Sequence, residues 1–237
     1  MIMHGDGHVG VYLHDGLLNV GGVYDNNFDV ILINPPFGAH VEKDMRITDS
    51  DIPTDREKSL YEKLYGSEYI SNVYNPIKKY AKEIGKDKKT GRRILDLYHI
   101  NSNSTEILFI ERCINLLKPG KRAGIVLPEG VLDNPALERV RRFIETRARI
   151  LNITSVPADV FLSSGANIKP SLVFIEKLKD GETPGKDYLL SVTRVSDAGI
   201  SSIGLPSQNE ELPIAAKEVS LWLRGEVMSD MTYTKIV

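Results

Sequence analysis

One stretch of this 237-residue chain decides its fold: Phe28-Asp29-Val30-Ile31-Leu32-Ile33-Asn34-Pro35-Pro36-Phe37-Gly38. Its first half is an unbroken apolar run, which predicts a strand covered on both faces within a parallel sheet. The run stops at Asn34, because two consecutive prolines cannot donate to a sheet ladder and Pro36 keeps Pro35 extended. Ligands of open α/β sheets bind at the carboxyl ends of strands. We therefore expect the tip that begins at Asn34 to carry function.

The tip offers two hydrogen-bond acceptors and one aromatic face. Asn34 has a side-chain carbonyl, and the carbonyl of Pro35 is followed by Pro36, which has no N–H. Two rigid acceptors side by side suit a planar NH₂ group, Phe37 can stack on a ring, and Gly38 allows close backbone approach. A strand-terminating turn with a core phenylalanine is the alternative interpretation. The position directly after an apolar strand favours a binding site.

The pattern Asp-x-Ile-x-x-Asn-Pro-Pro-Phe, which begins at Asp29, resembles the catalytic motif of S-adenosylmethionine-dependent amino-methyltransferases, chiefly the N6-adenine DNA methylases. Three later stretches are similar to the modification subunit of type I restriction systems: Glu106–Arg112, Leu117–Gly120 and Ile125–Gly130. Together they extend the resemblance over about residues 1–178. The resemblance implies a Rossmann-like α/β sheet, present from its third strand onward, with helices on both faces and an antiparallel strand near the C-terminal end.

The resemblance also implies an activity and its partners. Asn34, Pro35, Pro36 and Phe37 would be catalytic residues in site-specific methylation of adenine N6 in double-stranded DNA, with S-adenosyl-L-methionine as cofactor. The implied protein partners are a specificity subunit, in some assemblies a restriction subunit, and a second copy of the modification subunit. Methyltransferases that act on rRNA or on protein glutamine use near variants of the motif, so these substrates stay open.

The cofactor side of the resemblance is incomplete. Val9–Leu13 predicts a short strand, and the resemblance implies that Asp15 and Leu17 after it bind the cofactor, whereas an Asp-Gly turn explains Asp15 equally well from local sequence. These 237 residues contain neither the family's Gly-rich loop nor its ribose-binding acid. We therefore expect a fragment of a longer subunit, inactive alone, that binds cofactor weakly or not at all. A non-catalytic DNA- or subunit-binding remnant is the other possibility.

Composition indicates an ordinary globular chain. It is 41% hydrophobic with a formal charge of −2, so any DNA binding must come from local basic patches or a partner subunit. Cys113 is the single cysteine, which rules out an intrachain disulfide and predicts a buried, inert thiol. No metal site is expected. No apolar run is long enough to span a membrane and no signal-peptide core is present, so we predict a cytoplasmic protein without membrane contact.

Residues 39–101 are expected to form a long polar insertion with a basic cluster near its end. In sequence this cluster is opposed only by Glu83 and Asp87, and Tyr74 and Tyr80 interleave with it as candidates for base stacking. It can contact phosphates, or it can be a solvated loop. The candidate DNA-binding residues, including one near a later strand, are Lys78, Lys79, Lys82, Lys88, Lys89, Arg92, Arg93 and Lys169.

Helical and strand patterns alternate along the rest of the chain. A helix is predicted from Asn103, which with Glu106 forms a capping-box pattern, and another is capped by Asp133 or Asn134 and has Ala148 as its last buried residue. The other predicted helices are Asp55–Tyr65 and 215–224, and the predicted strands are 123–127, 150–157, 171–176 and 188–195.

We divide the chain at residue 180. Residues 1–180 are expected to be the C-terminal part of a methyltransferase catalytic domain, and 181–237 an extension that contacts another subunit. The loop 163–167 together with Lys169 is a further candidate for contact with the nucleic-acid backbone. Trp222 is expected in the core or at a subunit contact.

Overall fold

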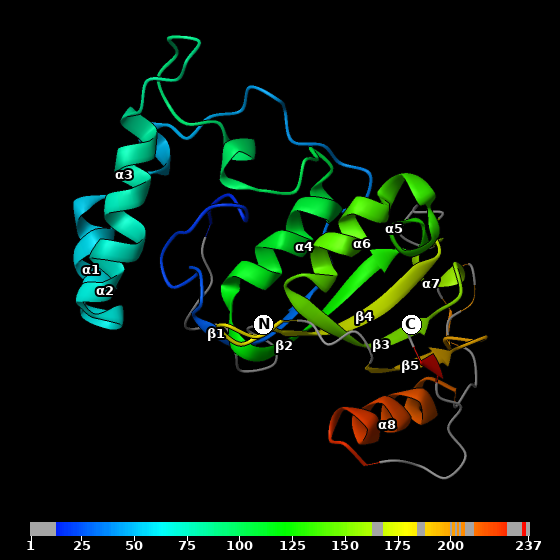
Figure 1. Cartoon of the computed structure of the whole chain (residues 1–237). Helices are drawn as coiled ribbons and strands as arrows, with labels where there is room; N and C mark the ends of the chain where they lie inside the picture. Colours follow the sequence, from blue (N-terminus) through cyan, green and yellow to red (C-terminus); the bar gives the residue numbers. More distant parts are fainter. Residues whose placement is uncertain are drawn as a thin grey trace.

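The protein folds around one mixed β-sheet, seen edge-on through the middle of Figure 1. The computed structural model describes residues 13–162, 168–183, 188–199, 201, 203, 205–206, 211–226 and 234–235. In this part of the chain the strand order is β1-β2-β4-β3-β5-β6. The strands are β1 (Phe28–Ile33), β2 (Leu117–Pro128), β3 (Ala148–Ser155), β4 (Pro170–Lys177), β5 (Leu189–Arg194) and β6 (Thr234–Lys235).

Four of these strands point the same way. β1 is parallel to β2 and β3 is parallel to β5, whereas β4 runs antiparallel to both β2 and β3, which places β2 and β3 in one direction. The carboxyl ends of β1, β2, β3 and β5 therefore meet at one edge of the sheet. The α/β class and the antiparallel strand near the C-terminal end are confirmed. β5 continues the same sheet beyond residue 180, and the division of the chain at that residue stays a prediction.

Helices cover both faces of the sheet (Figure 1). One face carries α4 (Thr105–Leu116), α5 (Glu129–Asp133) and α6 (Glu138–Glu145), and the other carries α8 (Glu211–Leu223). The short α7 (Asp159–Leu162) follows β3. α8 packs Ala215 against Val156, Val195 and Leu172, and the indole N–H of its Trp222 donates to the Leu151 carbonyl at 2.7 Å. No helix among the described residues combines the length and the hydrophobicity needed to cross a lipid bilayer.

The main core lies between the sheet and α4. Most positions of α4 are buried, including Cys113, because α6 and the chain before β1 cover the sides that the sheet leaves open. Burial raises the pKa of the Cys113 thiol to about 12, so the prediction of a buried, inert cysteine is confirmed. The core side chains include Ile107, Ile110, Ile114, Ile125, Leu127, Val140, Ile144, Val173 and Ile175.

The prediction that the strand at 28–33 is covered on both faces is wrong. Ile31 and Ile33 pack against the main core, but Val30 is 65% exposed and Leu32 is 78% exposed on the opposite face. Among the described residues β1 pairs only with β2, and α8 covers the far part of that face. Gly124 lies next to Leu32, and a Cβ there would stand 3.0 Å from Leu32 Cδ2. This glycine lets Leu32 lie flat on the sheet.

Two predicted helix boundaries also need correction. The N-cap of α4 is Ser104 rather than Asn103, and the Ser104 hydroxyl donates to Glu106 Oε1 at 2.5 Å. Ala148 belongs to β3, because the preceding helix already ends at Glu145. The predicted cap at Asn134 is confirmed: its Oδ1 accepts from the Ala136 N–H at 2.9 Å, with a proline at the first helical position.

The insertion 39–101 folds into a helical arm that stands apart from the sheet (Figure 1). It contains α1 (Asp55–Tyr65), as predicted, followed by α2 (Ser67–Tyr69), a π-helical turn (Ile70–Tyr74) and α3 (Asn75–Lys82). The chain enters and leaves this arm side by side: the Ile47 N–H donates to the Arg92 carbonyl at 3.0 Å, and the Ile94 N–H donates to the Met45 carbonyl at 2.9 Å. The predicted strand at Val9–Leu13, apart from its last residue, and the loop 163–167 lie outside the described residues.

Candidate active site

Thr105 of α4 fixes the backbone of the tip that follows β1. The Thr105 hydroxyl lies 2.8 Å from the Pro36 carbonyl and 3.1 Å from the Ala39 carbonyl, and the Thr105 N–H donates to the latter at 3.0 Å. Pro35 is buried, whereas Asn34 is exposed. In the described part of the chain no hydrogen bond occupies the Asn34 side chain or the Pro35 carbonyl. The exposed Asn34 side chain is therefore available to a ligand, and the carbonyl of the buried Pro35 has no competing hydrogen bond among the described residues.

A second aromatic ring stands beside the first. Phe37 and Phe161 meet edge to face, with ring centroids 5.8 Å apart and an angle of 85° between the planes. Phe161 lies on α7, which follows the carboxyl end of β3, and Phe37 follows the carboxyl end of β1. Because these strands are parallel, both rings reach the same edge of the sheet. Sequence reasoning gave Phe161 no role, although its place just after a strand was a usable signal.

The acid that opens the motif has a structural role. Asp29 is exposed, and its carboxylate lies 2.9 Å from Lys118 Nζ and 3.1 Å from Lys121 Nζ. Hydrogen bonds from these two lysines hold the pKa of the Asp29 carboxyl below its usual value. These two ion pairs fix the start of β1 to β2, away from the tip at Asn34.

α4 positions more than the tip. Thr105, Phe109 and Arg112 lie four and three residues apart, a spacing that places side chains on one helix face. The Phe109 ring lies close to Gly16: a Cβ atom added at Gly16 would be 3.0 Å from Phe109 Cζ. One helix therefore supports both the tip after β1 and the loop that carries Asp15.

Arg112 is the main support of that loop. Arg112 is only 3% exposed, and its Nε donates to the Gly16 carbonyl at 3.0 Å while Nη2 donates to the Leu18 carbonyl at 2.6 Å. Nη1 lies 2.5 Å from Asn19 Oδ1 and 3.1 Å from Asp25 Oδ1. Sequence reasoning missed Arg112. A charged residue inside an apolar helical run was the signal that could have found it.

The predicted cofactor contacts lie in this loop. Asp15 is half-buried, and one of its carboxylate oxygens accepts from the Leu17 N–H at 2.9 Å, which leaves the other for a ligand. The Leu17 side chain is 4% exposed in the main core, and its carbonyl accepts from the Tyr98 hydroxyl at 2.6 Å. The described residues thus offer S-adenosylmethionine one carboxylate oxygen and do not fit a complete binding site for it. The roles of Asp15 and Leu17 stay predictions.

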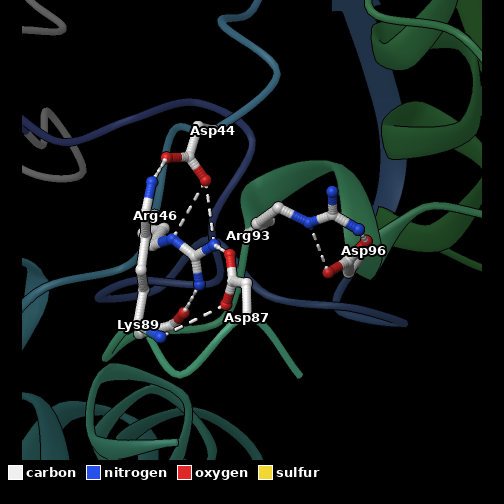
Figure 2. Close-up of polar contacts among 7 residues, drawn as sticks. Asp44, Arg46, Asp87, Lys89, Arg93 and Asp96 are labelled. Carbon is white, nitrogen blue, oxygen red and sulfur yellow. Dashed lines mark hydrogen bonds and ion pairs between the residues drawn. The ribbon is translucent and has the colours of Figure 1, made fainter. Parts of the chain in front are cut away.

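Four of the eight candidate DNA-binding cations are engaged in ion pairs, and Figure 2 shows the pairs of Lys89 and Arg93. Two acids that sequence reasoning did not count are brought to the cluster: Asp44 pairs with Lys89, and Asp96 pairs with Arg93 at 2.8 Å. Lys89, followed by Arg46, holds the pKa of the Asp44 carboxyl below its usual value. The remaining two pairs are Arg92–Glu83 at 2.9 Å and Lys169–Glu129 at 2.6 Å. The cluster is therefore less basic than its sequence suggests.

Arg46 joins the two segments at the base of the helical arm. Figure 2 shows its guanidinium between Asp44 and Asp87, and it also donates to the Gly91 carbonyl at 2.8 Å. Its side chain is largely buried by these contacts. The network holds the entry and exit of the arm together, so these charges serve the fold.

The remaining candidate cations lie on the arm. Lys78, Lys79 and Lys82 are on α3, and Lys88 lies in the following turn; none of them has an ion pair in the described part of the chain. The expectation that Tyr74 stacks on a base is wrong, because this ring is buried in a small core with Tyr61 and Tyr69. Tyr80 carries the Arg92 guanidinium over its ring, 4.3 Å from the centroid.

Comparison with solved structures identifies the fold class. A structure from a type I R-M system superposes with a TM-score of 0.54 at 21% identity, and the match covers 93% of this chain and 37% of that chain. The modification subunit of a putative type I restriction enzyme from Vibrio vulnificus YJ016 gives 0.49 at 17% identity, covering 89% and 34% of the two chains. A putative class I S-adenosylmethionine-dependent methyltransferase from Listeria monocytogenes gives 0.47 at 19%, covering 88% and 46%.

At this level of identity the first of these likenesses shows a shared fold, and the present chain spans little more than a third of that relative's length. No curated protein matches the chain. A family model described as N-6 DNA Methylase matches residues 67–193, which is more than half of the chain. The protein therefore belongs to the N-6 DNA methylase family. The matched region contains α4, which supports the tip, and begins after Asn34–Phe37 itself.

Proposed function

We propose that this chain is the amine-binding part of an adenine-N6 DNA methyltransferase, within the modification subunit of a type I restriction-modification system. Membership of the N-6 DNA methylase family supports methylation of DNA. The arrangement of the tip is the observation that favours an amine as the group that is methylated. The Asn34 side chain and the Pro35 carbonyl have no partner in the described residues, and they stand beside the aromatic pair of Phe37 and Phe161.

The substrate must reach this tip outside the double helix. An adenine inside a duplex is stacked and paired, so it has to be extruded at a cost of a few kcal/mol. Stacking on an aromatic side chain recovers about 1–3 kcal/mol per base. Phe37 provides the ring, and Phe161 holds Phe37 from the side. The extruded base can then present its amine to Asn34 and Pro35.

The residues of the tip orient the amine and stabilise its charge. The Asn34 side-chain carbonyl and the Pro35 carbonyl each accept one N6 hydrogen, which draws electron density onto the nitrogen and fixes the direction of its lone pair. The positive charge that develops on the nitrogen faces these two oxygen dipoles. Positioning and electrostatics of this kind carry the rate without a strong general base.

S-adenosyl-L-methionine supplies an electrophilic methyl group when it is bound. Because the described residues offer it only Asp15, we expect this chain alone to bind the cofactor weakly or not at all and to be inactive. In the complete protein the expected partners are double-stranded DNA, a specificity subunit, a restriction subunit in some assemblies and a second modification subunit. A cytoplasmic location is part of the same proposal.

The methylated product tests the function. Complete enzyme is incubated with double-stranded DNA and cofactor carrying a deuterated methyl group, and the digested nucleosides are analysed by mass spectrometry. We expect the label in N6-methyldeoxyadenosine. Parallel reactions contain rRNA or glutamine-containing peptides, because the tip accepts any planar amine. Label found only in RNA or peptide would replace the proposal by one of these alternatives, and label in no substrate would favour a non-catalytic binding role.

The Thr105→Val substitution tests whether α4 positions the tip. Valine keeps the volume and the backbone N–H but loses the hydroxyl contacts to the Pro36 and Ala39 carbonyls. We expect a loss of about 0.5–1.5 kcal/mol in the free energy of unfolding. Because misplacement by about 1 Å can cost about a hundredfold in rate, kcat should fall by at least about tenfold, with KM little changed.

Thr146→Val is the matched control. Its hydroxyl also contacts a carbonyl, that of Phe143 at 2.9 Å, but at the end of α6 and away from the tip. Equal kcat values for the two variants would show that the Thr105 hydroxyl does not position the reacting groups.

A further inference from the structure

A polar basin opens beside the tip, and the function proposed above does not use it. It has a volume of about 700 Å³, which lies within the usual range for ligand sites. Three segments form it: the loop that follows the tip, the segment that leads into α4, and the start of α6. The residues on which the argument depends are Lys43, Arg93, His99, Asn101, Asn103 and Arg139.

The floor of the basin is fixed by a buried carboxylate. Glu111 of α4 is 0% exposed and accepts from the N–H groups of His99 at 2.9 Å and Ile100 at 2.8 Å. The same carboxylate lies 2.8 Å from His99 Nδ1, while the His99 side chain is 75% exposed at the rim. A buried, multiply bonded carboxylate is costly to disturb. The backbone of this segment is therefore held in place before any ligand arrives.

The basin and the tip are neighbours. The Val41 N–H donates to the Asn103 carbonyl at 2.8 Å, which joins the loop after the tip to the wall of the basin. Thr105, two residues beyond Asn103, contacts the Pro36 carbonyl. A ligand in the basin thus lies one short loop away from a base held at Asn34.

The charges of the basin favour an anion. Lys43 and Arg139 are exposed, and neither has an ion pair within the part of the chain that the structure describes. Arg93 is balanced by Asp96 at 2.8 Å, so two positive charges remain uncompensated. The exposed side-chain amide of Asn101 adds a neutral donor of the kind that nucleic-acid phosphates accept.

We propose that this basin binds backbone phosphates of the DNA strand that presents its extruded base to the tip. The inference rests on the proposed function and adds to it the surface that fixes the strand. Contacts with phosphates set the register of a protein on nucleic acid, and contacts with bases set the specificity. Lys43 and Arg139 are positioning residues in this scheme, because neither touches the base.

Binding of this chain to DNA provides the test. Anisotropy of a short fluorescein-labelled single-stranded oligonucleotide that contains adenine is measured from low to physiological salt. Each phosphate contact to single-stranded DNA contributes about 0.7 to the slope of log K against log salt. We expect Lys43→Ala and Arg139→Ala each to weaken binding severalfold and to lower the slope by about 0.7, and the double variant to lower it by about 1.4.

Arg142→Ala is the control. Arg142 lies three residues after Arg139 on the same helix, but its guanidinium is paired with Glu138 at 2.7 Å. We expect its affinity and slope to equal those of the unaltered chain. Asn34→Ala should also keep the slope, so a failure of the proposed methylation and a failure of the basin give different results.

Two outcomes would overturn the proposal. The first is an unchanged slope in both basin variants, and the second is no binding of the unaltered chain even at low salt.

Discussion

We expect replacement of Asn34 by alanine to reduce methylation by the complete enzyme severely and to leave the fold of this chain intact. The side chain is exposed and has no hydrogen-bond partner among the described residues, so its loss changes the free energy of unfolding by no more than about 0.5 kcal/mol. Its carbonyl would accept one N6 hydrogen as charge develops on the nitrogen. Removal of one such preorganised dipole typically lowers kcat by about 10²–10³-fold. KM for DNA should change little, because Asn34 touches only the extruded base.

Methylation is measured with the labelled cofactor, and stability is measured by urea denaturation followed by circular dichroism. Asn72→Ala is a matched control, because Asn72 is an exposed asparagine on the helical arm. Its kcat should equal that of the unaltered enzyme. Methylation retained at the normal rate by the Asn34 variant would exclude Asn34 as an acceptor for the amine.

Replacing Arg112 by alanine has the largest expected effect on stability. The substitution leaves the Gly16 and Leu18 carbonyls without their donor and removes the cation that faces Asp25. Removal of one partner from a buried charged network costs about 3–5 kcal/mol. For a chain of this size each kcal/mol lowers the melting temperature by about 2–4 °C. We therefore expect a decrease of about 10 °C.

Arg112→Lys separates the charge from the geometry. Lysine keeps the positive charge but cannot reproduce the planar fork that reaches carbonyls on several sides, so it should recover only part of the stability. Arg142→Ala, an exposed position with one ion pair, should shift the melting temperature by about 2 °C or less. Equal melting temperatures for the Arg112 and Arg142 alanine variants would contradict the role assigned to Arg112.

Local sequence patterns predicted most of the elements of this fold. The helix at Asp55–Tyr65 has the predicted bounds, because its Thr54 cap and charged first turn are encoded within a few residues. The antiparallel strand at Pro170–Lys177 was expected from the resemblance, and its apolar run is plain. Coverage of β1 could not be predicted in the same way. Apolar side chains show that Val30 and Leu32 can be buried, but they do not show which element would cover them.

The candidate site was predictable where its chemistry is contiguous in sequence. The two acceptors and the ring at 34–37 are read directly from four residues. Phe161 and the partners of the basic cluster are distant in sequence, because Asp44 meets Lys89 only after the arm has folded back. Contacts of this kind need the topology. Arg112 is an intermediate case. A charged residue among buried helix positions predicts that a polar partner exists, but the sequence does not show which residue it is.

The entry and exit of the helical arm lie side by side, while Ile77 and Ala81 of α3 pack into the main core. Backbone hydrogen bonds from Ile47 to Arg92 and from Ile94 to Met45 close its base, and α1–α3 lie beyond that closure. The distance that the main body has to bridge is therefore short and does not depend on how many residues the arm contains. Such an attachment allows the outer part of the arm to differ in length between relatives, while α3 stays packed on the main core and the tip after β1 keeps its place on α4.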